Sequence, residues 1–142
     1  MKLHLSVNKL ELAGYTNIDV TKQPIDLGKL DNICSTSECT DIIVDDLLRF
    51  IPYEALPGVA QHLISKLRHK GRITIIFTDF NSIIREFNTG NIDEKTLNQL
   101  LFLNGSRSCF SSEYLTNALK ATQINIVSVS VGKKTIIIAE RP

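Results

Sequence analysis

The opening stretch MKLHLSVNKLELAGYTNID, residues 1–19, decides the fold. A short apolar run around Leu3 and Leu5 meets a polar turn at Asn8, and a second short run ends on Asp19. This pattern predicts a strand, a loop, a second strand and a terminal acid. In open α/β sheets, ligands of the nucleotide type lie at the carboxyl end of the first strand, and an acid that ends the second strand can bind ribose hydroxyls. The usual loop glycines are missing here, so the frame predicts a fold and leaves the ligand open.

Length and composition place the chain among ordinary globular proteins. Its 142 residues fit a single domain, and a hydrophobic content of 43% is enough for a full core. A formal net charge of +1 gives no field that favours nucleic acid or a membrane surface, so we expect neither partner. The three cysteines have no metal-ligand spacing, and no apolar run is long enough for a signal sequence or a membrane span. We therefore expect a cytoplasmic protein with reduced thiols.

The first half of the chain predicts a parallel sheet with one abbreviated crossover. The connection between strands at 2–5 and 16–20 has room for about one helical turn, which is too short for a full crossover helix. Residues 21–40 are polar and predict a loop with one short strand at 25–27. A β-branched run at 41–44 predicts a buried parallel strand. An apolar stripe over 56–67 predicts a helix that ends in a basic cluster, with Gly71 as its left-handed cap.

The second half predicts the most apolar strand, short helices and a closing hairpin. The strand covers 73–77, and helices are expected around 83–87, from Asp93 to about 101, and from a cap at Ser111 or Ser112 to about 122. The hairpin joins 124–131 to 135–139, so its strands are antiparallel. The continuous apolar run 136–138 predicts either a buried strand, which we favour, or an edge that pairs with another chain.

Asp45 and Asp46 stop the strand at 41–44, where α/β enzymes place their chemistry. A carboxylate there can accept a proton as a general base or can bind a cofactor hydroxyl. The alternative is that they cap the next helix, since aspartate is a strong N-cap. The sequence leaves both roles open.

Several short strings, in order along the chain, carry a resemblance to one family. They are Leu3-His4-Leu5, Ser6-Val7-Asn8, Ala13-Gly14-Tyr15, Asn17-Ile18-Asp19, the turn at 67–72, and Asp79-Phe80. This succession resembles the short class I S-adenosylmethionine-dependent methyltransferases that are often found among sugar and polysaccharide genes. The resemblance implies a Rossmann-like fold with a mostly parallel sheet and a C-terminal antiparallel hairpin strand. It also implies S-adenosylmethionine as cofactor, held by Asp19 and by the loop of Ser6, Val7 and Asn8.

The sequence departs from that family where the chemistry lies. Ser6 and Asn8 replace two loop glycines, and the Ser6 side chain takes space where the methionine part of the ligand would lie. Asp46, Arg49 and Phe50 stand where the family carries a histidine and then a glutamate-histidine pair. These departures predict a degenerate cofactor site in a protein that acts as a binding or structural subunit, with a protein partner or as a homo-oligomer.

Two alternatives remain open on the sequence. One is an active S-adenosylmethionine-dependent methyltransferase that modifies a small-molecule or sugar hydroxyl, with Asp45 or Asp46 as general base. The other is a nucleotide-binding α/β module of a different kind. That module should show a glycine-rich phosphate loop, which this chain lacks.

Overall fold

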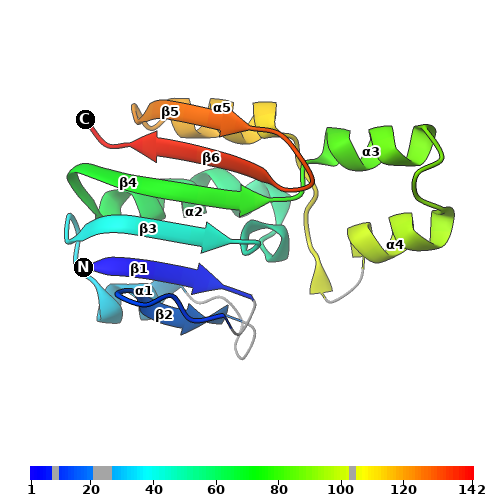
Figure 1. Cartoon of the computed structure of the whole chain (residues 1–142). Coiled ribbons are helices and arrows are strands. Elements are labelled where there is room, and N and C mark those ends of the chain that lie inside the picture. The colour runs from blue at the N-terminus through cyan, green and yellow to red at the C-terminus, as the bar shows by residue number, and fades with distance from the viewer. Residues whose placement is uncertain (8–9, 21–26, 103–104) are drawn as a thin grey trace.

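A computed structural model describes residues 1–7, 10–20, 27–102 and 105–142, apart from the side chains of 27–29. In these residues a six-stranded sheet has the order β2-β1-β3-β4-β6-β5 (Figure 1). The strands are β1 (Lys2–Ser6), β2 (Thr16–Asp19), β3 (Cys39–Asp45), β4 (Leu67–Phe77), β5 (Asn125–Ser130) and β6 (Thr135–Glu140). Neighbours from β2 to β4 pair in parallel, and β6 pairs antiparallel with both β4 and β5. The predicted mostly parallel sheet with a C-terminal antiparallel hairpin is confirmed.

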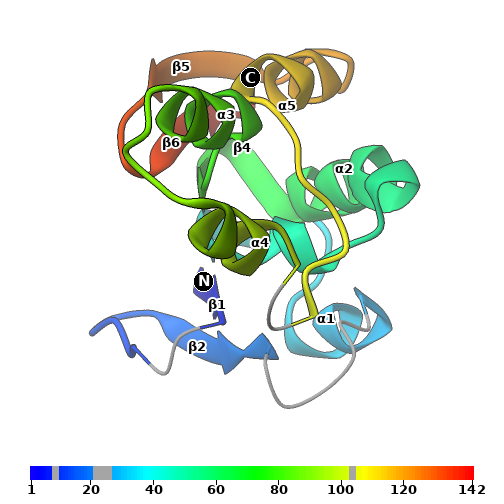
Figure 2. The same cartoon turned by 90° about the vertical axis from the view of Figure 1, so that its right-hand side faces the viewer.

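Three helices pack on one face of this sheet. They are α1 (Leu27–Ile33), α2 (Leu56–Lys66) and α5 (Ser112–Lys120). Figures 1 and 2 agree that all three lie on the same side, whereas α3 (Phe80–Asn88) and α4 (Glu94–Phe102) extend beyond the carboxyl ends of the parallel strands. Two short 3-10 helices, η2 (Leu48–Phe50) and η3 (Tyr53–Ala55), lead from β3 into α2. None of the described helices is long and apolar enough to cross a membrane.

The strand order explains why the helices gather on one face. The connections from β2 to β3, from β3 to β4 and from β4 to β5 all move in the same direction across the sheet. Because such crossovers are right-handed, their helices fall on the same side. Among the connections between parallel strands, only the step from β1 to β2 moves the other way, and its described residues contain no helix. The abbreviated first crossover predicted from the sequence therefore leaves the other face without a layer of described helices.

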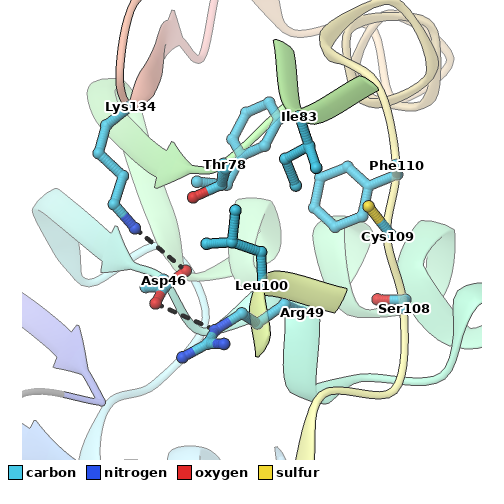
Figure 3. Close-up of a pocket in the computed structure, with 10 residues that line it drawn as sticks. Asp46, Arg49, Thr78, Ile83, Leu100, Ser108, Cys109, Phe110 and Lys134 are labelled. Carbon is cyan, nitrogen blue, oxygen red and sulfur yellow. Dashed lines mark ion pairs between the residues drawn. The ribbon is translucent and has the colours of Figure 1, made fainter. Parts of the chain in front are cut away.

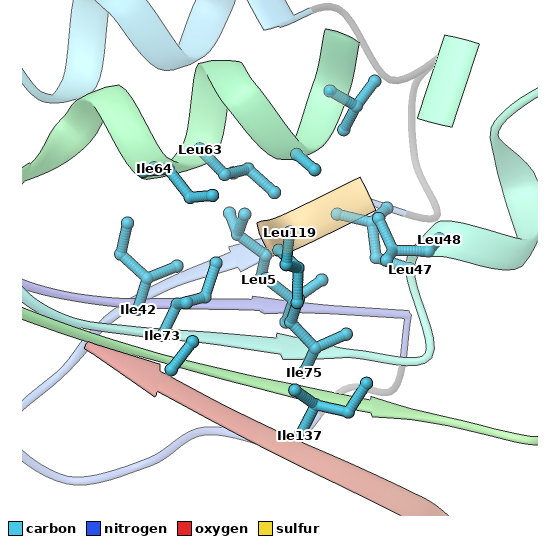
Figure 4. Packing of buried hydrophobic residues seen from close by; sticks show 14 of the residues in the cluster. Leu5, Ile42, Leu47, Leu48, Leu63, Ile64, Ile73, Ile75, Leu119 and Ile137 are labelled. Atoms are coloured by element: carbon cyan, nitrogen blue, oxygen red, sulfur yellow. The ribbon is translucent and has the colours of Figure 1, made fainter. Parts of the chain in front are cut away.

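The helix-covered face carries the hydrophobic core. Strand residues such as Ile42, Ile73 and Ile75 meet Leu63 of α2 and Leu119 of α5, and each is at most 1% exposed (Figure 4). Full burial of one such side chain contributes about 1.5–3 kcal/mol to stability. The Phe77 ring extends this core toward the carboxyl end of the sheet, where it lies 5.0 Å from the ring of Phe110. We call this surface the covered face.

The opposite surface, which we call the open face, carries the alternate residues of the same strands. Its residues at the amino end of the parallel strands are charged, and Arg72 donates to Glu140 across 2.8 Å. Its centre is made of Thr74, Ile76 and Ile138, which are half-buried. Among described residues, only the connection between β1 and β2 lies over it, at the corner formed by those two strands (Figure 2).

The side chain of Asn17 holds that connection in place. Its oxygen accepts a hydrogen bond from the Leu12 backbone amide at 2.9 Å, and its nitrogen donates to the carbonyl oxygens of Leu12 and Tyr15, both at 3.1 Å. The same oxygen lies 2.8 Å from Nδ1 of His4, which is only 2% exposed. One corner of the open face is thus closed, and the described residues leave the part from β3 to β5 bare.

Two local predictions are wrong. Leu27 begins α1 and is not in a strand, while the rest of the strand predicted at 25–27 lies outside the described residues. The stripe of α2 does not end on a glycine cap, because the helix ends at Lys66 and β4 begins at Leu67 in an extended conformation. The basic residues that follow lie in an irregularity of the β3–β4 pairing, where Lys70 takes a φ of +58°.

Gly71 serves a different purpose from the predicted cap. A Cβ atom at this position would lie 2.9 Å from the carbonyl oxygens of both Arg68 and Cys39. Real Cβ atoms do not approach backbone oxygens this closely, so glycine is needed for β3 and β4 to close around the irregularity.

Lys66 is buried because its ammonium group pairs with Asp31 of α1 at 2.5 Å.

The other predicted strands and helices are confirmed, most of them within two residues, but β4 begins six residues before the predicted 73 and α3 begins three residues before the predicted 83. Asp93 and Ser111 begin α4 and α5 as expected, because their side chains accept from the Thr96 and Tyr114 amides. The hairpin is also confirmed, although the strand on its outer edge is β5 and the apolar run 136–138 belongs to the inner strand β6.

Candidate functional site

The predicted cofactor contacts gather where the parallel strands end. The register pairs Ser6 with Asp19 on one side and with Asp45 on the other, so the three residues form one row across β2, β1 and β3. Ser6 is 2% exposed, while Asp19, Asp45 and Val7 are half-buried. Asn8, the remaining predicted contact, lies outside the described residues. The structure therefore brings together one hydroxyl and two carboxyl groups predicted from sequence.

Asp46 lies apart from that row. Its backbone is left-handed, with a φ of +56°, and its amide donates to the Ile76 carbonyl oxygen at 2.9 Å. This turn places Asp46 between Arg49, whose Nε is 3.0 Å from Oδ2, and Lys134, whose Nζ is 3.6 Å from Oδ1 (Figure 3). Asp46 therefore joins the end of β3 to η2 and to the β5–β6 hairpin. The next helical segment begins after Leu47 without a side-chain cap, so the capping role considered for both acids is wrong.

A pocket of about 160 Å³ opens beside this ion-paired group. Its charged side is formed by Asp46, Arg49 and Lys134, and its apolar side includes Ile83 and Leu100 (Figure 3). Ligand pockets for drug-sized molecules span about 300–1,000 Å³, and a cavity of about 150 Å³ holds benzene. This pocket admits a molecule of that smaller size.

Residues 106–111, which we call the strap, form one wall of the pocket. The Arg107 and Ser108 amides donate to the Arg49 carbonyl oxygen at 2.7 and 3.0 Å, and the Ser108 hydroxyl donates to the Leu48 carbonyl oxygen at 3.1 Å. Nη1 of Arg49 in turn donates to the Ser106 hydroxyl at 3.0 Å. Sequence reasoning missed the strap, because a polar loop without periodicity gives no sign of where it docks.

Asp79 follows β4 and holds together the two ends of the segment that contains α3 and α4. We call this segment, residues 80–110, the α3–α4 excursion. Its Oδ2 accepts from the Ser82 amide at 3.3 Å as the cap of α3, and its Oδ1 accepts from the Ser112 amide at 2.6 Å. The side chain is 4% exposed. Its oxygens are therefore engaged in holding the chain.

The nearby thiol does not provide a nucleophile at neutral pH. Burial, and next the charge of Asp79, raise the pKa of Cys109 to about 11. The thiolate is the reactive form of cysteine, and it is scarce several pH units below such a pKa. Among the described residues, no three histidine, cysteine or acidic side chains come together as a metal site.

Comparisons with known proteins identify the fold. No protein-family model and no curated protein matches the sequence. Among solved structures, a SAM-dependent methyltransferase from Archaeoglobus fulgidus superposes with a TM-score of 0.60 at 9% identity, over 96% of this chain and 74% of that one. The fold is that of class I methyltransferases. An O-methyltransferase family protein from Burkholderia thailandensis matches with a TM-score of 0.63 at 12% identity, over 89% of this chain.

A third methyltransferase structure extends the likeness. It is an O-methyltransferase family 2 protein from Planctomyces limnophilus in complex with apigenin, with a TM-score of 0.59 at 18% identity over 90% of this chain. The chain spans only 36% of the Burkholderia protein and 34% of the Planctomyces protein. At these identities the likeness concerns the arrangement of the backbone, and the chemistry of the site must be argued from this chain's residues.

Proposed function

We propose that this chain is a methyltransferase-fold protein with a degenerate S-adenosylmethionine site, and that it acts as a binding or structural subunit. The observation that carries the proposal is the placement of Asp46. A general base must reach the proton that it removes. Here one carboxylate oxygen faces Arg49 and the other faces Lys134, so the group joins three chain segments.

The state of the first loop supports the same proposal. Ser6 is almost fully buried at the end of β1, where the resembling family has a glycine that leaves room for the ligand. Positive φ values of described non-glycine residues occur at Ser37, Asp46, Lys70 and Gln123, and not at Ser6 or Val7. The described part of the loop therefore lacks the left-handed turn that glycines make easy.

An active S-adenosylmethionine-dependent methyltransferase is the second candidate, and the row of Ser6, Asp19 and Asp45 favours it. In that case Asp19 would bind the ribose hydroxyls and the backbone of residues 6–8 would face the methionine part. Asp45, half-buried at the end of β3, would be the base toward a small-molecule or sugar hydroxyl.

Calorimetric titration with S-adenosylmethionine, and separately with its demethylated product, distinguishes the two candidates. The subunit proposal expects no binding heat at millimolar ligand from protein that circular dichroism shows to be folded. Micromolar binding that is lost in Asp19→Ala and kept in Asp41→Ala would overturn it in favour of the enzyme. Asp41 is a matched control because it lies on the same sheet face at the amino end of the parallel strands.

A further inference from the structure

We propose that the open face pairs two copies of this chain, packed sheet on sheet about a two-fold axis that runs parallel to the strands between β4 and β6. The inference names the partner for the subunit role proposed above and in that sense rests on it. Pairing and cofactor binding are measured separately, so either can fail alone.

The type of sheet is the first reason to expect that another surface packs on the open face. Mostly parallel sheets occur almost only with both faces covered, and here the described helices cover one face. The bare part carries Thr74 and Ile76 of β4 beside Ile136 and Ile138 of β6, a block of β-branched side chains in the middle of the sheet. Such a surface packs well against another sheet, at a spacing of about 10 Å with strands within about 30° of each other.

The charges around that block are self-complementary. Arg72 and Glu140 are register partners at the amino end of β4 and the carboxyl end of β6. A two-fold axis between these strands exchanges them, so that Arg72 of one copy faces Glu140 of the second copy and the reverse. A two-fold interface brings the same patch of both copies together, and a patch with alternating charge satisfies this arrangement without repulsion.

The next rows of the sheet also match across this axis. Ile76 of one copy faces Ile136 of the second copy, and Thr74 faces Ile138, so the apolar block lies at the centre of the contact. Farther out, β3 faces the outer strand β5 of the second copy, which places Ile43 opposite Ser128. No row places two like charges in opposition.

Two features of the open face locate the axis. The connection held by Asn17 covers the β1–β2 corner, which leaves β3, β4, β6 and β5 bare, and the centre of those four strands lies between β4 and β6. Pairing through the β5 edge is the rival arrangement. Its ladder is interrupted by a register shift between Ile126 and Ser128, and such a bulge disfavours the addition of a further strand.

Sedimentation equilibrium on the purified chain tests the proposal. The chain should sediment at about twice its 15.9 kDa in the micromolar range. Ile138→Lys places a charge at the centre of the contact and should weaken pairing by about tenfold or more. Val129→Lys is the matched control, because Val129 is an exposed β-branched residue on the outer strand whose side chain lies on the other face.

A charge-reversal pair makes the test independent of packing. Arg72→Glu should weaken pairing, and the double variant Arg72→Glu, Glu140→Arg should restore it, since both the contact within the chain and the contact between copies are rebuilt. A chain that stays monomeric across this concentration range overturns the proposal. So does a dimer that Val129→Lys dissociates as strongly as Ile138→Lys, which would assign pairing to the β5 edge. Circular dichroism and thermal unfolding establish that each variant is folded.

Discussion

The covered face and the open face are built from neighbouring residues of the same strands, but these residues differ in their exposure to solvent. Ile75 is 1% exposed under the helices, whereas Ile76, the next residue along β4, is half-buried on the open face. Both are isoleucines in the same strand, so composition does not separate them. The strand order separates them, because the crossovers that contain helices all lie on the Ile75 side. The comparison teaches that a crossover without a helix leaves one face of a sheet outside the core, even where its residues are as apolar as those of the covered face.

The largest loss of stability should come from truncating Ile75, and truncation of its neighbour Ile76 provides the comparison. Ile75→Ala should lower the free energy of unfolding by about 2–5 kcal/mol, because the covered face is closely packed and cannot fill the cavity. Ile76→Ala should cost about 1 kcal/mol in the dilute monomer, since its side chain is partly in water. Chemical denaturation at low protein concentration measures both. Equal losses would mean that the two faces do not differ in packing.

Removing the Asn17 side chain, which holds the β1–β2 connection over one corner of the open face, should have a smaller effect on stability. Asn17→Ala deletes hydrogen bonds to Leu12 and Tyr15 and the contact with His4, and it should cost about 1–3 kcal/mol. Asn17→Asp keeps the accepting oxygen and loses the donor, so its loss should be intermediate. Proteolysis within residues 10–15 should become faster in Asn17→Ala. An unchanged cleavage rate would show that the connection is held by other contacts.

The pH dependence of stability tests the helical layer of the covered face. The hydrogen bond from Lys66 is the main cause that lowers the pKa of Asp31 below its ordinary value of 3.8, with His62 adding to it. A depressed folded pKa means that Asp31 stabilises the fold above pH 3.8 and loses this contribution as the pH falls through the folded pKa. Wild type should therefore be more stable than Asp31→Asn at neutral pH, and the two unfolding curves should converge in acid. A constant difference across that range would contradict the ion pair.

The rate of thiol labelling should differ between the covered face and the open face. Burial, and next the charge of Cys34, raise the pKa of Cys39 on the covered face to about 12, so this thiol should not react with maleimide until the chain unfolds. An Ile138→Cys variant should label quickly in the dilute monomer and slowly at concentrations that support pairing. Equal labelling rates at both concentrations would leave the open face bare in solution.

Sequence patterns predicted most of the fold because periodicity reports burial. The apolar residues of α2 and β4 predict these elements because they are the residues that the fold buries. The short β1–β2 connection is predicted from the number of residues between the two strands. The end of α2 was mispredicted because its signals were local. Lys66 does lie in the last turn of α2, but its charge pairs with Asp31, which lies 35 positions away, and the basic residues after it belong to β4.

The candidate site was predicted in part, for a similar reason. Ser6, Asp19 and Asp45 each end a strand, so parallel pairing was sufficient to bring them into one row. The partners of Asp46 could not be found in the same way. Lys134 comes from a hairpin far along the chain, and the strap that binds Arg49 has no hydrophobic pattern.

The closed base of the α3–α4 excursion has a consequence for how the molecule opens. The Phe80 amide donates to the Phe110 carbonyl oxygen at 2.9 Å, and Asp79 accepts from the Ser112 amide, so both ends of the excursion are fastened at one point. The helices α3 and α4 can therefore unfold and refold as a separate cooperative unit while β4, the strap and α5 keep their places. Changes on the surfaces of α3 and α4 that lie away from the pocket residues Ile83 and Leu100 are therefore insulated from the sheet, and these surfaces are free to diversify.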